Sequence, residues 1–131
     1  MNWFAVVVAG VSAFILGGVW YGPLFSKRWQ LLVELSDEEI ASGNPVIRFG
    51  LSFVMTLIVS IALAAVMPSL LSAPALLNGM LLGAGLSLFF VATSFAINYL
   101  FARRPLALYA IDVGYLVLMF ALMGAILGGW R

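Results

Sequence analysis

The sequence predicts an all-α integral membrane protein that folds as a four-helix transmembrane bundle in a single domain, residues 1–131. The composition points to a membrane, because the chain is 65% hydrophobic and only 8% charged, whereas an average globular protein is about 25% charged. The apolar runs have the length of one membrane crossing, about 20 residues each. They show no strand-like alternation, and a spanning backbone must satisfy its own hydrogen bonds, so each run is expected to form a helix.

Breaks in the apolar pattern divide the chain into four spans. Residues 1–26 carry no side-chain charge, and neither do residues 49–102. Pro68 and Pro74 divide the second of these runs into two lengths that each suit one crossing. The spans are therefore predicted near residues 3–25, 46–67, 75–101 and 106–130.

The first span ends in Gly22 and Pro23. Proline has no backbone N–H to donate, so the helix is expected to kink or end there. This would direct Trp20 and Tyr21 into the inner half of the bundle.

The first connection holds the longest polar segment. Ser36 followed by Glu39 matches a helix capping box, and Gly43 to Pro45 form a stop before the second span. These signals predict a short interfacial helix between the first two spans. It serves either as a connector or as a docking site for a cytoplasmic partner.

Basic residues near the helix ends predict the orientation. Cytoplasmic connections are enriched in Lys and Arg, and acids count little in this rule. Only Arg131 lies on the side of the termini, so both termini are predicted outside. Trp3 and Trp130 then anchor the outer interface and Trp29 the inner one. The basic residues of the first and third connections are Lys27, Arg28, Arg48, Arg103 and Arg104.

Small residues recur at a spacing of four, which lets helix backbones approach closely. Such pairs serve either packing within one bundle or an oligomer interface. The pair in the fourth span is the best candidate for an oligomer interface, because it lies near the carboxy terminus. The predicted helix-packing pairs are Gly18 with Gly22, Gly79 with Gly83, and Gly124 with Gly128.

Asp112 is the one acid within the four spans. It lies seven residues after Pro105, which places it about 10 Å into a hydrocarbon core of about 30 Å. A carboxyl group at that depth needs a hydrogen-bonding partner or a proton. Asn98 and Ser52 are expected at similar depth, and Tyr109 and Tyr115 flank Asp112 at three-residue spacing on its own helix. The predicted polar cluster consists of Asp112, Asn98, Ser52 and one or both tyrosines, capped by Arg48.

Three interpretations of Asp112 remain open. Asp112 is either a hydrogen-bond node that fixes helix register or a protonatable site for proton-coupled transport. In the third interpretation the predicted start of the fourth helix is misplaced, so that Asp112 does not lie as deep as expected. An enzyme is not expected, because acid–base catalysis usually needs two groups with separated pKa values. The chain also lacks Cys and His, and no catalytic, metal or cofactor-binding residue and no nucleic-acid partner is predicted.

Five segments of the chain carry a resemblance to a known family: "MNWFAVVVAG", "WYGPLFSKRW", "GNP", "INYLFARRP" and "MGAILGGW". Their order and spacing resemble the small bacterial membrane proteins grouped as domain of unknown function 1761. The resemblance extends over nearly the whole chain. It implies a four-helix membrane protein with no established activity and no functional residues to carry over.

The expected protein is therefore a multi-pass protein of the bacterial inner membrane with unknown physiological role. It is expected to work as a packing or interaction unit and to form a parallel homo-oligomer. Its expected partners are membrane lipids and either further copies of itself or another membrane protein. The alternative is a small proton-coupled transporter or channel subunit that uses Asp112.

Overall fold

The computed structural model describes residues 1–130 and contains no strand among them. Four helical segments are long and apolar enough to cross a membrane. This confirms the predicted all-α fold with four spans. Four such helices are the architecture of a multi-pass membrane protein. The four segments are Trp3–Leu24, Pro45–Leu70, Leu76–Ala102 and Leu106–Gly129.

Two of the four segments contain a π-helical stretch. The first consists of α1 (Trp3–Val19) and a π-helix, η1 (Trp20–Leu24). The third consists of α5 (Leu76–Leu86), a second π-helix, η2 (Ser87–Ala92), and α6 (Thr93–Ala102). The others are single α-helices, α4 (Pro45–Leu70) and α7 (Leu106–Gly129).

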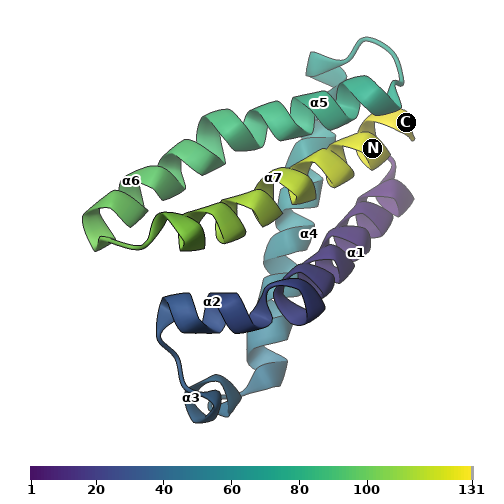
Figure 1. The fold of residues 1–131 in the computed structure, drawn as a ribbon. Helices are drawn as coiled ribbons and strands as arrows, with labels where there is room; N and C mark the ends of the chain where they lie inside the picture. Colours follow the sequence, from purple (N-terminus) through teal and green to yellow (C-terminus); the bar gives the residue numbers. More distant parts are fainter. Residues whose placement is uncertain (131) are drawn as a thin grey trace.

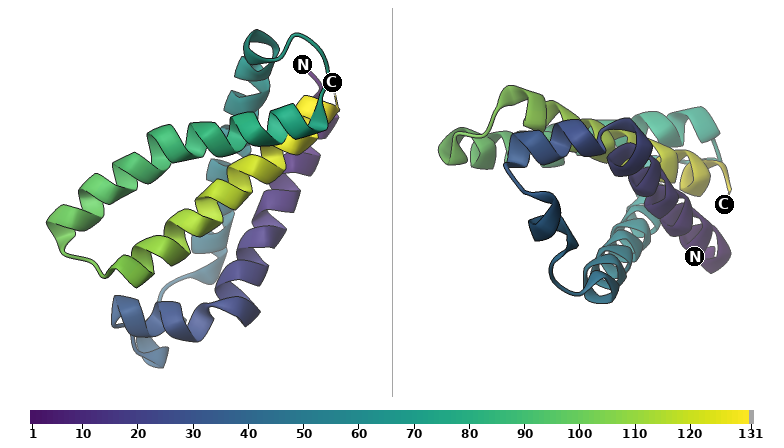
Figure 2. Two further views of the ribbon diagram at one scale, coloured as in Figure 1. Left: turned by 45° about the horizontal axis from the view of Figure 1, so that its top comes forward. Right: turned by 60° about the horizontal axis from the view of Figure 1, so that its bottom comes forward.

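The chain folds back on itself so that its two ends lie together (Figure 1). Both termini and the α4–α5 connection lie at one end of the bundle. The first connection and the α6–α7 turn lie toward the other end. The hairpin of α5, α6 and α7 crosses α1 and α4, and its α6–α7 turn diverges from the beginning of α4 (Figures 1 and 2).

The tightest contact in the bundle joins α5 to α7, where glycines of one helix face backbone atoms of the other. A Cβ added at Gly79 would collide with the carbonyl oxygen of Gly124, and one added at Gly83 would collide with the carbonyl oxygen of Phe120. At Gly128 an added Cβ would lie 2.7 Å from the Cα of Gly79. These glycines are therefore needed for the close approach of the two backbones.

This contact corrects the oligomer prediction for the fourth span. The face of Gly124 and Gly128 is covered by α5 of the same chain, because the short α6–α7 turn returns α7 antiparallel beside it. The pair on the first span is placed differently. Around a Cβ added at Gly18 or Gly22, no atom of another described helix lies within 4 Å, so no neighbouring helix of the same chain packs closely on this pair.

The core lies where α1, α4 and α7 meet, and its members are mostly small or flexible. Alanines of α1 let α4 and α7 approach, and Ser60 of α4 donates a hydrogen bond to the carbonyl oxygen of Val6 at 2.8 Å. Methionines fill the remaining irregular space. The buried cluster includes Ala5, Ala9, Ala13, Leu63, Met67, Met119, Met123 and Leu127.

The first connection contains two short helices, α2 (Ser26–Val33) and α3 (Asp37–Ala41), where one was predicted. The capping box at the start of α3 is present. Ser36 Oγ accepts from the backbone N–H of Glu39, and Glu39 Oε1 accepts from the backbone N–H of Ser36, both at 3.1 Å. Such reciprocal bonds satisfy two of the free N–H groups at a helix start.

Pro68 does not end the second span, contrary to the sequence-based expectation. It lies inside the last turn of α4, which continues to Leu70. The backbone N–H of Leu71 still bonds to the carbonyl oxygen of Met67 at 2.8 Å. Pro68 itself has no N–H to donate to the carbonyl oxygen of Ala64, and only two residues of α4 follow it.

The glycine contact between α5 and α7 gives a first prediction. Gly83→Ala places a methyl group against the backbone of α7, so the helices must separate, and we expect a loss of about 1 to 3 kcal/mol of unfolding free energy. Gly85→Ala on the same helix is the matched control, because nothing lies within 4 Å of its added Cβ. There we expect no loss, since alanine favours a helix over glycine by up to about 1 kcal/mol. Unfolding in mixed detergent measures both, and equal stabilities of the two variants would contradict the contact.

Candidate functional site

Asp112 joins three of the four spans. It lies in the second turn of α7 and is half-buried. Its Oδ1 accepts a hydrogen bond from the hydroxyl of Tyr21 at 2.7 Å, and its Oδ2 accepts one from the hydroxyl of Tyr99. Tyr21 belongs to the end of the first span and Tyr99 to the third. Both oxygens of the carboxyl group are therefore held by side chains from different helices.

Tyr21 reaches Asp112 because the first span ends in a π-helix. Pro23 has no N–H, and in the wider π turn the backbone N–H of Phe25 bonds to the carbonyl oxygen of Trp20, five residues earlier, at 3.0 Å. The sequence-based expectation that Pro23 disturbs the helix and directs Trp20 and Tyr21 inward agrees with this geometry. Helical structure nevertheless continues through the proline to Leu24.

Trp20 forms a second bond beside that of Tyr21. Its indole N–H donates to the backbone carbonyl oxygen of Ile111 at 2.9 Å. A Cβ added at Gly114 would lie 3.2 Å from the Trp20 ring, so the absence of a side chain there makes room for the indole. Two consecutive residues of η1 thus bind two consecutive residues of α7, Ile111 and Asp112.

Tyr99 reaches Asp112 from the other side, along a segment that contains η2. An α-helix turns by about 100° per residue, so the extra residue of a π turn changes the face on which every later side chain lies. The carbonyl oxygen of Ala92, at the end of η2, accepts a hydrogen bond from the hydroxyl of Tyr109 at 2.8 Å. The rings of Tyr99 and Tyr109 meet edge to face with centroids 5.9 Å apart.

A layer of aromatic rings surrounds the carboxyl group. The rings of Tyr21 and Tyr115 lie 5.5 Å apart, and Tyr115 donates its hydroxyl to the carbonyl oxygen of Ala13 at 3.1 Å. Trp29 of α2 contacts Tyr21, with ring centroids 6.0 Å apart. Tyrosines suit this place, because the ring is apolar while the hydroxyl bonds to a polar group in the bundle.

The predicted polar cluster does not assemble as expected. Tyr109 and Tyr115 lie near Asp112, but their hydroxyls bond to backbone carbonyl groups. Asn98 is exposed on α6. Ser52 is exposed as well, and its hydroxyl donates to the carbonyl oxygen of Arg48 at 2.8 Å.

Arg48 does not cap the carboxyl group. Its Nη1 donates to the carbonyl oxygen of Ser42 at 3.5 Å, and its guanidinium carbon lies 5.7 Å from the centre of the Phe49 ring. The reason is the divergence of α4 from the hairpin at this end (Figure 2). Within residues 1–130, no basic side chain forms an ion pair with Asp112, and its partners are hydroxyl groups.

This arrangement can do two things chemically. It can fix the relative positions of three helices, because the two hydroxyl donors meet one carboxyl group only in one register. It can also take up or release a proton, because carboxyl and hydroxyl groups both exchange protons. Within residues 1–130, no three Asp or Glu side chains are placed to hold a metal ion.

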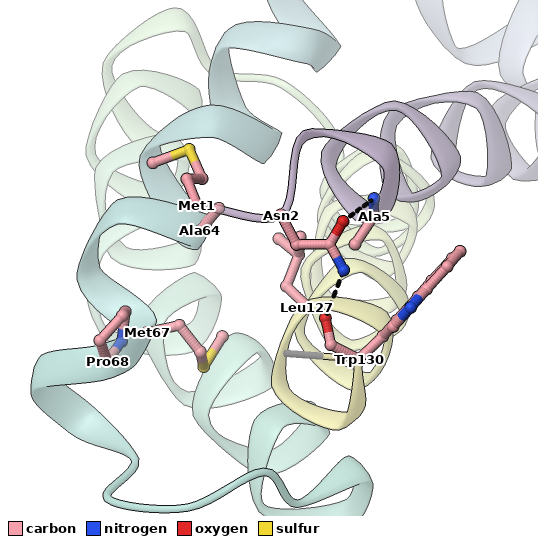
Figure 3. Close-up of a pocket in the computed structure, with 8 residues that line it drawn as sticks. All are labelled: Met1, Asn2, Ala5, Ala64, Met67, Pro68, Leu127 and Trp130. Carbon is pink, nitrogen blue, oxygen red and sulfur yellow. Dashed lines mark hydrogen bonds between the residues drawn. The ribbon is translucent and has the colours of Figure 1, made fainter.

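A cavity of about 230 Å³ lies at the other end of the bundle (Figure 3). Met1, Met67, Leu127 and Trp130 line it and are apolar. Asn2 at its edge accepts from the backbone N–H of Ala5 at 3.1 Å and donates to the carbonyl oxygen of Trp130 at 3.2 Å. These bonds cap α1 and tie the two ends of the described chain together.

Comparison with known proteins gives a family and no activity. The family model described as protein of unknown function, DUF1761, matches residues 4–128. No curated protein and no solved structure matches the chain. The match covers nearly all of the sequence, including both tyrosines that bind Asp112. The chain therefore belongs to the DUF1761 family of proteins of unknown function.

Proposed function

We propose that the protein is a packing and interaction unit of the bacterial inner membrane, in which Asp112 fixes the arrangement of three spans. The observation that carries this proposal is the pair of hydrogen bonds from Tyr21 and Tyr99 to the two oxygens of one carboxyl group. The proposed role is not enzymatic, because Asp112 is the one acid of the spans and its oxygens are already engaged.

The energies are consistent with a structural node. A charged residue in the middle of a span costs about 2.5 to 3.5 kcal/mol on insertion scales. Each hydrogen bond to a charged group contributes about 1.5 to 3 kcal/mol, so two such bonds offset the cost. The two bonds form only when η1, α6 and α7 are in register. The carboxyl group therefore adds specificity of packing more than net stability.

We further propose that the unit forms a parallel homo-oligomer within the lipid bilayer. Support comes from Gly18 and Gly22, which have open space beside them in one chain. A helix of a second copy, or of another membrane protein, could approach closely there. A single orientation in the membrane would make the copies parallel around an axis along the membrane normal.

The proposed orientation has both termini outside and the first connection in the cytoplasm. It is supported by the basic residues of α2, α4 and the α6–α7 turn, which lie away from the end that carries the termini (Figure 1). Arg131, the basic residue predicted for the other side, lies outside the described residues.

The orientation gives a second prediction. Alkaline phosphatase fused after Arg131 should be active, because this enzyme folds outside the inner membrane. A fluorescent protein fused at the same place should be dark, because its fluorophore does not form there. Fusions in the first connection should show the reverse pattern. Fluorescence from the carboxy-terminal fusion in most cells would overturn the orientation.

The alternative function is a small proton-coupled transporter or channel subunit that uses Asp112. One observation favours it: the carboxyl group is only half-buried, and its partners are hydroxyls that can pass a proton. The two functions differ in what they require of Asp112. A structural node needs hydrogen bonding, whereas a proton carrier needs a group that titrates.

Replacement of Asp112 gives a third prediction. Asp112→Asn keeps the shape and can still bond to both hydroxyls if one of them turns to accept. We expect it to retain most of the wild-type stability and any cellular phenotype. Asp112→Leu leaves two hydroxyls without their partner, which costs about 1 to 3 kcal/mol of stability for each hydroxyl when it is buried.

Thermal unfolding of the purified variants measures both effects, and a proton-flux assay in proteoliposomes tests the alternative. Proton flux in the wild type that disappears in a well-folded Asp112→Asn protein would favour the transporter.

A double-mutant cycle gives a fourth prediction. Tyr21→Phe should destabilise the wild type more than it destabilises Asp112→Leu, because the hydroxyl has lost its partner in the second background. Arg48→Leu is the matched control. Its guanidinium bonds elsewhere, so its effect should be equal in both backgrounds. A coupling for Arg48 as large as that for Tyr21 would contradict the site geometry.

A further inference from the structure

One hydroxyl group of the third span is buried without a partner. Ser87, the first residue of η2, is fully buried, and its Oγ forms no hydrogen bond within residues 1–130. Serine and threonine in a helix can satisfy the hydroxyl by donating to the carbonyl oxygen four residues earlier, and Thr93 and Ser94 of α6 do so. The π-helical stretch thus begins at an unpaired buried polar group, which is uncommon in a folded protein.

A second polar side chain of this span also lacks a partner. The carboxamide of Asn98 is exposed on α6 and forms no hydrogen bond with another residue of 1–130. The bilayer interior holds no water that could replace such a bond, so an unpaired carboxamide in a span is costly. Asn98 directly precedes Tyr99, whose hydroxyl bonds to Asp112.

The geometry of a π turn connects these two features. A π-helix closes its turns between residues five apart instead of four, so η2 holds one residue more than an α-helix along the same path. If η2 became α-helical, each later residue would take the place of the residue after it. This shift is a rotation of α6 by about 100° with a slide of about 1.5 Å. Asn98 would then occupy the place of Tyr99 beside Asp112.

The side chains that would arrive suit the carboxyl group. The carboxamide of Asn98 has two N–H donors, so it can replace the hydroxyl of Tyr99 as a donor to Asp112. Ser94 would take the place of the half-buried Phe95 one turn earlier. Two aromatic rings would thus be exchanged for two short polar side chains. The shorter side chains let α6 move closer to α7, which brings the carboxamide within reach of the carboxyl group.

The packing of α6 permits this movement but favours the observed arrangement. No residue of α6 is buried, and the helix lies at the outer edge of the hairpin (Figures 1 and 2). The backbone N–H groups of Arg103 and Arg104 bond to carbonyl oxygens of α6 itself, so the turn would move with the helix. Against the movement, Ala92 is buried, and the larger Val91 would have to enter its place. The arrangement with Asn98 is therefore the less populated one.

We propose that α6 is a register switch in which Tyr99 and Asn98 alternate as the partner of Asp112. In the observed register η2 is π-helical and Tyr99 donates the bond. In the second register η2 is α-helical, Asn98 donates the bond, and the hydroxyl of Ser87 can donate to the carbonyl oxygen of Gly83. Asn98 is thus available to a neighbouring helix of the membrane only in the observed register. The switch rests on the proposed role of Asp112 as a node between the spans, and it adds a second partner to that node.

Nuclear magnetic resonance of the full-length chain in lipid nanodiscs tests the switch. The side-chain amide signals of Asn98 are identified by their loss in Asn98→Ala. In Tyr99→Phe the carboxyl group loses one donor, so the population ratio of the second register should rise by about tenfold, which corresponds to about 1.4 kcal/mol. The amide signals of Asn98 should then move toward those of a bonded carboxamide.

Fluorotyrosine gives a second measurement in a protein that keeps Tyr99. It labels all four tyrosines, and Tyr99→Phe identifies the fluorine signal of Tyr99 by its loss. Asn98→Ala removes the alternative partner, so this signal should move toward its fully bonded position. Asn78→Ala is the matched control, because it removes another exposed asparagine of the same span without touching α6. It should leave the signal of Tyr99 unchanged.

Deletion of Phe89 separates a change of register from a loss of stability. Phe89 is 77% exposed in η2, and its removal takes out the extra residue of the π turn. An ordinary α-helix then keeps Tyr99 beside Asp112. In this background Tyr99→Phe should leave the amide signals of Asn98 unchanged, because the second register is no longer accessible.

Three outcomes would overturn the switch. One is an unchanged set of Asn98 signals in Tyr99→Phe, and another is an equal response to that substitution with and without Phe89. The third is an identical Tyr99 signal in the wild type and Asn98→Ala. If the deletion variant fails to fold, judged by helix melting, the two substitutions decide alone. Unchanged Asn98 signals together with a destabilised Asp112→Leu protein would reject the switch and keep the node, so the two proposals fail separately.

Discussion

The close approach of α5 and α7 determines how the rest of the bundle is arranged. In the half that carries the α4–α5 connection, glycines bring the two backbones into contact. In the half that ends in the α6–α7 turn, the same hairpin carries Tyr99 and Tyr109, and the helices separate toward that turn (Figure 1). The hairpin is therefore narrow at one end and wide at the other. The wide end leaves space for Trp20 and Tyr21 of the first span.

The first and third spans each contain a π-helix before or at the residues that reach α7 in the wide part of the hairpin. One brings Trp20 and Tyr21 onto α7, and the other precedes the stretch that brings Tyr99 to the same carboxyl group. Short π-helical stretches are uncommon, and they are often found where a protein places functional side chains. Here η1 carries Tyr21, and η2 precedes Tyr99 on its span, so both spans that donate a hydrogen bond to Asp112 contain a π-helical stretch. This shared feature is the reason to regard Asp112 as the main candidate for a functional residue.

The sequence was sufficient to predict the helical fold, the capping box and the need of Asp112 for hydrogen-bonding partners, because each depends on local signals. Apolar length predicts a span, Ser36 with Glu39 predicts a helix start, and a lone acid in a span indicates a special environment.

The partners of Asp112 could not be predicted in the same way. Tyr109 and Tyr115 share its helix and have suitable spacing, yet the bonds come from Tyr21 and Tyr99. Depth along a span was a reasonable guide, but the rotation of each helix depends on the π turns. The sequence around η2 has no proline or other visible signal for such a turn.

The order in which the chain is synthesised gives a further meaning to the bond between Tyr21 and Asp112. These residues are 91 positions apart, and Tyr99 also precedes Asp112 in the chain. Both hydroxyl donors therefore leave the ribosome before the carboxyl group that they bind. The span with Asp112 enters the bilayer after the spans that carry Tyr21 and Tyr99, when the helices that receive it are already made. The one acid of the four spans thus meets its hydroxyl partners as it arrives, and completion of the four-helix bundle depends on α7.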